Sequence, residues 1–460
     1  MLIVYVAYAM LSVIGFTYIR INQVTKEASN TSPYDLASFQ EKSPAVEKVG
    51  MTHRTEDALP LRLELIDKAE ERLWLAQYTI SPDDSGLLVI EHLVSAAERG
   101  VSIKIVVNGL SNNTREGSLL QLVSGYENVE IKKIGGINLL KPWEMNNVVH
   151  DKLLIVDDSY LLSSGRNISD RFMIPSETKG VTRDMDVVIQ SDNDESEEGV
   201  LFQGKTYFNE LWLSDSARVV RDYPDSSKKR KKEREYNEQI TQSKKRHKAL
   251  LQHQILDNMA FFEVDKGYLV HNPTNQLVKV PVVWQQVTHL MNQSEKKVSL
   301  MSPYVVMTKP MWSFVHIPKE REFTVYTNSG GTSPNVFAFG GYLTQKKTLQ
   351  KMGNIWEFQS KDSIHQKVFS VDDTVFGIGS LNTDSRSAFL SHENMVIVKS
   401  QGGAEQLQRI MKDYENQSLK ATGLFSYAES EGVEESKVSF FKKILLFLFS
   451  ILSPVIRLFL

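Results

Sequence analysis

The chain has 460 residues, enough for about three domains of average size or for fewer large ones. Its 53 basic and 56 acidic residues nearly cancel to a net charge of −3, so no global charge favours a nucleic-acid partner. The chain contains no cysteine, which excludes disulfides, thiolate metal sites, a catalytic cysteine and a lipid-modified N-terminal cysteine.

The N-terminus reads as a membrane segment. Leu2 to Ile19 is almost wholly apolar and ends at Arg20, and a run of this length can just span a hydrocarbon core of ~30 Å. A cleaved signal peptide is the alternative, but no basic residue precedes the run and no clear small-x-small site follows it. We therefore expect residues 1–20 to be an uncleaved N-terminal anchor and residues 21–54 to be a polar tether.

Helical and strand patterns alternate after the tether. Leu61 to Leu75 has helical periodicity, and Arg72 to Ile80 reads as a strand. Leu87 to Arg99 reads as a helix that Gly100 ends, and Val101 to Val107 alternates as a strand does. Such alternation is typical of an α/β fold with a parallel or mixed sheet.

The second half of the chain repeats this order. Its segments Lys297–Met301, Glu322–Thr327 and Glu393–Val398 match Arg72–Ala76, Ser102–Val107 and Asp184–Ile189 of the first half. A repeat of this size predicts two related domains, residues 55–215 and 259–418, because solenoid units are far shorter.

A basic stretch separates the two predicted domains, within residues 216–258. It contains Lys228 to Lys232 and Lys244 to Lys248. A solvated helix or linker explains it, and so does contact with anionic lipid headgroups, worth ~1 kcal/mol per basic residue near such a surface.

The tail, residues 419–460, ends in an apolar segment from Phe440 to Leu460. Lys442, Lys443 and Arg457 lie within this segment and Pro454 interrupts it, which argues against a plain spanning helix. We expect residues 440–460 to lie in a membrane interface, with docking on the protein as the alternative.

One pattern, which carries the chemistry, occurs twice. His, Lys, Asp and Asn fall at i, i+2, i+7 and i+17 in both copies: His150, Lys152, Asp157 and Asn167, then His365, Lys367, Asp372 and Asn382. His and Lys two apart on a strand share a face, so each buried strand delivers an imidazole and an ammonium to one spot. Lys, Asn and Gly/Ser amides together can hold a phosphate, beside which a histidine can attack phosphorus or transfer a proton. One HxK pair is common by chance, whereas two copies with identical offsets are not.

These residues resemble the phospholipase D superfamily, whose mark is a duplicated HxKxxxxD motif followed by Gly-Gly or Gly-Ser and Asn. The pairs Ser164-Gly165 and Gly379-Ser380 stand at the Gly/Ser positions, the first with a small departure in order. The resemblance implies an α/β protein of two pseudo-repeated phospholipase D-like domains, each a mixed sheet flanked by helices, packed with one shared active site.

Further segments are similar to bacterial cardiolipin synthases of the C type. They are Gly165–Asp170, Arg183–Asp186, Ser302–Tyr304, Thr327–Ser329 and Asn382–Ser387 with Glu393. Two segments depart from that pattern: Asn108-Gly109 replaces an acidic pair, and Ser391-His392-Glu393 replaces Asn-Thr-Glu.

The resemblance implies a two-step phosphodiester exchange through a phosphohistidine. His150 and His365 act as nucleophile and acid/base in an order that the near-symmetric pair leaves open, although in the family the N-terminal histidine usually attacks. Asp184 and Glu393 are expected to orient the two histidines. The remaining expected site residues are Lys152, Lys367, Asn167 and Asn382 for charge stabilisation, Ser164, Gly165, Gly379 and Ser380 for substrate binding, and Asp157 and Asp372, which tie each motif loop together.

The implied activity is transfer of a phosphatidyl group to phosphatidylglycerol, as in a cardiolipin synthase. The expected partners are phosphatidylglycerol, phosphatidylethanolamine as an alternative donor, the membrane and an accessory protein of unknown kind. Metal, cofactor and nucleic acid are not expected. The alternatives are a hydrolytic phospholipase D, a nuclease and a catalytically silent scaffold. The expected location is the bacterial inner membrane, held by the N-terminal anchor.

Overall fold

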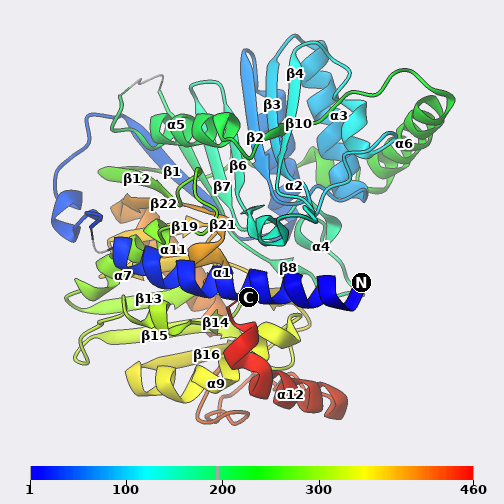
Figure 1. The fold of residues 1–460 in the computed structure, drawn as a ribbon. Helices are drawn as coiled ribbons and strands as arrows, with labels where there is room; N and C mark the ends of the chain where they lie inside the picture. Colours follow the sequence, from blue (N-terminus) through cyan, green and yellow to red (C-terminus); the bar gives the residue numbers. More distant parts are fainter. Residues whose placement is uncertain (1, 29, 193–195, 459–460) are drawn as a thin grey trace.

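The structure, a computed structural model, describes residues 2–28, 30–192 and 196–458. Within that part of the chain two large mixed sheets form the body of the protein, with helices on their outer faces (Figure 1). Met1, Phe459 and Leu460, which fall in the predicted terminal segments, lie outside the described residues.

The first sheet has the strand order β10-β4-β3-β2-β6-β7-β9-β1-β11 in the described residues. Strands β2, β3 and β4 are parallel, and β6, β7, β9 and β1 continue antiparallel. The bounds are β1 Glu47–Thr52, β2 Arg72–Gln77, β3 Ser102–Asn108, β4 Val129–Ile134, β6 Lys152–Val156, β7 Tyr160–Ser164, β9 Asp186–Ser191, β10 Arg218–Val219 and β11 Phe261–Glu263.

The second sheet repeats this arrangement in the order β12-β22-β19-β18-β13-β15-β16-β23. Strand β13 corresponds to β2, β15 to β3 and β22 to β9, so the repeat predicted from the sequence is confirmed. The bounds are β12 Lys266–His271, β13 Lys297–Met301, β15 Glu322–Asn328, β16 Asn354–Phe358, β18 Val368–Val371, β19 Val375–Gly379, β22 Asn394–Lys399 and β23 Ser418–Lys420.

Helices cover each sheet and fill the space between them. Helices α2 and α3 pack on the outer face of the first sheet, while α1, α7, α9 and α12 pack on the outer side of the second. Side chains of α5 and α11 join both sheets in a central core. The bounds are α1 Leu2–Ala28, α2 Thr55–Asp67, α3 Asp84–Glu98, α5 Val200–Leu213, α6 Ser227–Arg246, α7 Val282–Asn292, α9 Val336–Met352, α11 Gln401–Glu415 and α12 Phe440–Ile456; the short helices are α4 Asp170–Met173, α8 Lys309–Trp312 and α10 Ser385–Phe389.

The prediction that an N-terminal anchor holds the protein in the inner membrane is wrong. In the described part of the chain no helix combines the length and apolar character needed to cross a membrane. Instead α1 lies against the protein (Figure 1): Ile21 and Val24 are buried in the core of the second half, and the rings of Phe16 and Trp143 pack together. An apolar run predicts burial without saying whether protein or lipid provides it.

Helix α6 accounts for the basic stretch between the sheets. It packs on α3 through the buried residues Ile240 and Ser243. Many of its cations are already paired with acids of the first half: Lys228 with Glu116, Lys229 with Asp222, Lys244 with Glu91 and Arg246 with Asp84. The basic stretch is therefore a surface helix whose charge is partly neutralised.

Two short ladders join the halves next to the duplicated motifs. Strand β5 (Val148–Val149) pairs with β21 (Ser391–His392), and β8 (Thr182–Arg183) pairs with β17 (Ser363–Ile364). Each ladder brings one motif histidine beside an acid from the opposite half.

Candidate active site

His150 follows β5 at the junction between the halves. Its backbone N–H donates to the carbonyl of His392 at 3.0 Å, and its Nδ1 lies 3.0 Å from the Glu393 carboxylate. The edge of the Tyr78 ring packs on its imidazole. Burial, followed by the charge of Lys152, lowers the pKa of His150 well below its usual value, so the free protein holds this imidazole neutral.

His365 has the matching environment. Its backbone N–H donates to the carbonyl of Arg183 at 2.7 Å, and its Nδ1 lies 2.6 Å from Asp184. Burial and then Lys367 lower the pKa of His365 to about 3. Each histidine therefore takes its orienting acid from the other half of the chain, and in both the acid engages Nδ1 and leaves Nε2 for chemistry.

The two acids differ in their protonation. Burial would raise the pKa of Asp184, but Lys367 and His365 outweigh it and hold this pKa below its usual value. Burial raises the pKa of Glu393 to about 7 against the opposing effects of Lys152 and Ser380. At neutral pH Asp184 is ionised, whereas Glu393 is close to its titration midpoint.

The motif lysines lie beneath the histidines with their ammonium groups buried. Lys152 donates to the carbonyl of His150, and Lys367 donates to that of His365. Burial lowers the pKa of Lys152 to about 7 and that of Lys367 to about 8. An anion in contact with these ammonium groups would raise both pKa values.

The last residue of each motif is an asparagine whose side-chain oxygen is not hydrogen-bonded. The side-chain oxygens of Asn167 and Asn382 are buried and have no hydrogen-bond partner among the described residues. Groups of this kind call for a partner from outside the chain, because an unsatisfied buried polar atom costs about 1–3 kcal/mol.

The Gly/Ser pairs lie against the acids of the site and the backbone beside them. A Cβ on Gly165 would lie 2.3 Å from Asp184 Oδ1, and one on Gly379 would lie 2.2 Å from the Asn394 carbonyl oxygen, so only glycine fits at either position. The hydroxyl of Ser380 donates to Glu393, and that of Ser164 donates to Asp186.

Asp157 and Asp372 lie apart from the histidines, at the far ends of their strands. Both adopt positive φ, 49° and 51°. Each carboxylate accepts hydrogen bonds from three successive backbone N–H groups, at 2.7–2.9 Å: those of Glu70, Glu71 and Arg72 for Asp157, and of Glu295, Lys296 and Lys297 for Asp372. The motif aspartates therefore fasten the start of the neighbouring strand and do not touch the reacting centre.

A buried ion-pair network supports Asp184, and the sequence reasoning missed it. Asp186 pairs with Arg62 at 2.8 Å and with Arg166 at 3.0 Å, and Arg166 also donates to the carbonyl of Asp184. The signal was present in the charged residues of Gly165–Asp170 and Arg183–Asp186, segments used above only for resemblance. In the described residues no group of three or more His, Asp or Glu side chains is placed to hold a metal ion.

A family profile described as "Cardiolipin synthase, PLD-like domain" matches residues 63–212 and 287–415, more than half of the chain. The chain belongs to this phospholipase D-like family. With both motifs intact, it is an enzyme of the phospholipase D superfamily.

Individual relatives are distant but extensive. Cardiolipin synthase C of Escherichia coli is 23% identical over 407 residues, which cover 77% of this chain and 81% of that protein. An uncharacterized protein of Helicobacter pylori is 24% identical over 412 residues, covering 79% and 78%. The crystal structure of phosphatidylserine synthase from Haemophilus influenzae aligns with a TM-score of 0.65 at 13% identity, over 95% of this chain and all of that one. This likeness shows the shared fold, a pair of phospholipase D-like α/β domains.

Proposed function

We propose that the protein is a phosphatidyltransferase of the cardiolipin synthase type, which moves a phosphatidyl group from one glycerophospholipid to the hydroxyl of phosphatidylglycerol. The observation that carries the proposal is the crossed pair of acid–histidine contacts, His150 with Glu393 and His365 with Asp184. It provides two imidazoles with free Nε2 atoms in a buried setting that also holds two lysines. The family match and the relatives' names support lipid as the substrate class.

In the first step of the proposed reaction, Nε2 of His150 attacks phosphorus. A P–N bond forms while the P–O bond to the departing alcohol breaks. His365, whose Nε2 takes up a proton from solvent when the bound phosphodiester anion raises its pKa, donates that proton to the departing oxygen. In the second step His365 takes the proton from the incoming hydroxyl, whose oxygen attacks phosphorus and breaks the P–N bond. The choice of His150 as nucleophile rests on the resemblance to the family.

The charged and amide groups of the site stabilise the transition state. The ammonium groups of Lys152 and Lys367 and the side-chain N–H groups of Asn167 and Asn382 are proposed to donate to the non-bridging oxygens, where negative charge develops. Gly165 leaves room for the Asp184 carboxylate, and Gly379 leaves room for the Asn394 backbone carbonyl. The hydroxyls of Ser164 and Ser380 hydrogen-bond to Asp186 and Glu393. No step requires a metal ion or an organic cofactor.

We also propose that α12 contacts the lipid surface from which substrates come. The helix packs on α9 through Leu446 and the contacting rings of Phe337 and Phe449, which fixes it to the protein. Its opposite side leaves large apolar side chains in solvent, among them Phe440 at 74% and Phe441 at 79% exposure. Exposed apolar side chains on a helix with basic residues are typical of interfacial helices.

The boundaries of the two domains, residues 55–215 and 259–418, remain predictions.

A matched pair of variants tests α12. Substitution of Phe440 and Phe441 by serine should reduce sedimentation with anionic vesicles and leave the melting temperature unchanged. Val219→Ser, which removes another exposed apolar side chain, serves as the control. If the double variant binds vesicles as the unaltered protein does, α12 has only a docking role.

A hydrolytic phospholipase D is the second candidate, because it differs only in letting water reach the intermediate. A nuclease is less well supported, since many cations of α6 are already paired with acids. A catalytically silent scaffold does not explain two intact constellations with unsatisfied buried amide oxygens.

The deciding experiment follows lipid products in mixed phosphatidylglycerol and phosphatidylethanolamine vesicles, with His150→Ala and His365→Ala as controls. New cardiolipin that both variants fail to make supports the proposal, and omission of phosphatidylethanolamine identifies the donor. Phosphatidic acid without cardiolipin favours the hydrolase. Absence of any lipid turnover would refute the proposal and direct the next assay to nucleic acid.

A further inference from the structure

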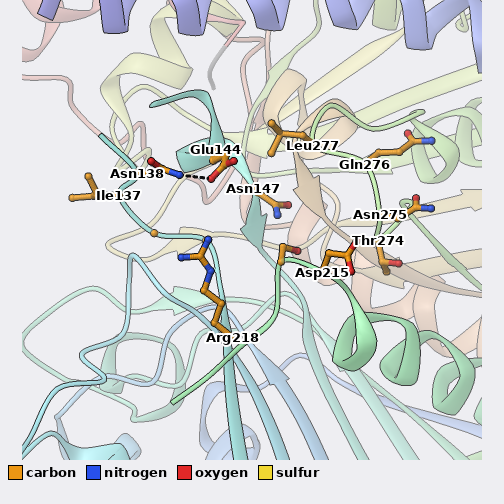
Figure 2. Close-up of a pocket in the computed structure, with 13 residues that line it drawn as sticks. Ile137, Asn138, Glu144, Asn147, Asp215, Arg218, Thr274, Asn275, Gln276 and Leu277 are labelled. Atoms are coloured by element: carbon orange, nitrogen blue, oxygen red, sulfur yellow. Dashed lines mark hydrogen bonds between the residues drawn. The ribbon is translucent and has the colours of Figure 1, made fainter. Parts of the chain in front are cut away.

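A polar cavity lies at the junction between the halves, outside the duplicated motifs (Figure 2). Its volume is about 310 Å³, at the small end of the range for ligand pockets, which is roughly 300–1,000 Å³. One wall comes from the first half, residues 135–147 and 215–218, and the other from residues 274–277 of the second half. No motif histidine, lysine or asparagine lines it.

Several polar side chains of this cavity have unused hydrogen-bonding capacity. Among the described residues, the exposed side chains of Asp215 and Arg218 and the half-buried side chain of Thr274 have no hydrogen-bond or ion-pair partner, and all three line the same hollow. In Figure 2 the Arg218 side chain rises from its strand toward the loop that carries Asn138 and Asn147. The cavity therefore offers a guanidinium, a carboxylate and a hydroxyl from both halves of the chain.

The innermost part of the cavity is held in place by close backbone packing at Gly135 and by hydrogen bonds to Asn147. Gly135 has a φ of 80°, and a Cβ there would come within 2.6 Å of the Asn147 carbonyl oxygen. Asn147 is almost fully buried, and its Oδ1 is held by His392 Nε2 at 2.9 Å and by Lys279 Nζ at 3.3 Å. Its amide nitrogen has no hydrogen-bond acceptor among the described residues, so it is available to a ligand.

We propose that this cavity binds a small polyol of the glycerol type, either as the headgroup of a lipid or free in solution. A hydroxyl both donates and accepts, so vicinal hydroxyls match a lining that interleaves donors such as Arg218 and Asn147 with acceptors such as Asp215 and Glu144. Ile137 and Leu277 add an apolar side that suits the C–H face of such a molecule. An anion alone would meet two carboxylates, and the lining contains no aromatic ring on which a sugar ring could stack.

A neighbouring hollow points to a route for acyl chains. This hollow, about 730 Å³, shares Asp215, Thr274 and Asn275 with the polar cavity. It adds the apolar side chains of Leu213, Leu269, Val270, Pro273 and Val282. A lipid could thus place its polyol in the polar cavity and a chain along the adjoining surface.

A ligand in the cavity would also affect the β5–β21 strand pair next to His150 and Glu393. Asn147 immediately precedes β5, which pairs with β21, and these two strands lead directly to His150 and to Glu393. A ligand that holds the Asn147 amide therefore also holds the strand pair that sets the distance between this histidine and its acid. The binding site itself does not depend on the proposed reaction.

The test uses a polyol without phosphate, so that the phosphate-holding groups of the active site are not engaged. Saturation-transfer NMR with threitol is measured on the full chain, on an Arg218→Ser/Thr274→Val double variant, and on the matched control Arg221→Ser, which removes an exposed arginine outside the cavity. We expect saturable binding that weakens at least tenfold in the double variant, stays within twofold in the control, and persists in His150→Ala. O-phosphoethanolamine serves as the counter-probe.

Further measurements distinguish a lipid headgroup from a free polyol as the ligand. Tighter binding of dihexanoyl phosphatidylglycerol that the double variant also loses assigns the polyol to a lipid, whereas equal binding of threitol and this lipid assigns it to a free molecule. Absence of saturable threitol binding, equal binding to the double variant, or stronger binding of O-phosphoethanolamine overturns the proposal. Because no arm measures turnover, failure of the proposed reaction would not be mistaken for failure of this site.

Discussion

Asp184→Asn should abolish most of the activity while leaving the fold intact. The substitution preserves the volume of the side chain but removes the negative acceptor that lies 2.6 Å from His365 Nδ1. Lys367 Nζ also lies 2.6 Å from the same nitrogen. Without the carboxylate, the lysine can donate to Nδ1, which moves the imidazole proton to Nε2 and leaves that atom unable to accept one.

The expected size of the loss follows from this tautomer change. In a serine protease the corresponding acid-to-amide change lowers kcat by about 10⁴-fold. We expect about 10³- to 10⁴-fold here, which is about 4 to 5.5 kcal/mol of activation free energy at roughly 1.36 kcal/mol per tenfold. The competing lysine places the loss toward the upper end of this range.

Single-turnover product formation in mixed lipid vesicles measures the effect, and circular dichroism with thermal melting checks the fold. Asp362→Asn is the matched control, since this acid pairs with Arg183 at the same junction and is not in contact with a histidine. A folded Asp184→Asn protein with activity within about tenfold of the original would refute the reasoning, because a tautomer change of this kind costs far more.

Three other predictions follow from the same geometry. Turnover should peak near pH 7. It falls toward acid because Glu393, with a pKa of about 7, gains a proton, and toward base because Lys152 and Lys367, with pKa values of about 7 and 8, lose theirs. A flat kcat/KM profile across this range would contradict this prediction. Gly165→Ala should cost about 10²-fold in turnover by displacing Asp184, unlike Gly125→Ala, whose added Cβ meets open space; equal losses would argue against this cause. Asp372→Asn should lower the free energy of unfolding by about 1–3 kcal/mol in denaturant titrations and leave folded protein active, with Asp373→Asn as control; lost turnover at unchanged stability would indicate a catalytic role instead.

The sequence predicted the repeat and the motif strands well, because both depend on spacing. Two strands with identical offsets and buried apolar stretches can form only matching elements, and β6 and β18 are fully buried as expected. The helix predicted from Leu61 to Leu75 ends at Asp67, because β2 begins at Arg72 and the two periodicities overlap in the sequence.

The pairing across the halves could not be read from one chain. Asp184 and Glu393 were expected to orient histidines, yet nothing in their spacing says that Asp184 serves His365 and Glu393 serves His150. That assignment is made by β5–β21 and β8–β17, ladders of two residues each, too short to leave a periodic signal. The wrong prediction of an anchor at α1 has a similar origin. The sequence from Leu2 to Ile19 shows that the segment is apolar but not whether protein or lipid covers it.

The exchange of acids between the halves makes each repeat an incomplete catalyst. A single repeat carrying its own histidine, lysine and asparagine would lack the carboxylate that fixes its imidazole, so it could work only by pairing with another copy. Joining two repeats in one chain removes that concentration dependence. It also allows the two copies to differ in sequence, so one junction here uses aspartate and the other glutamate, and the surroundings of the two histidines are not identical.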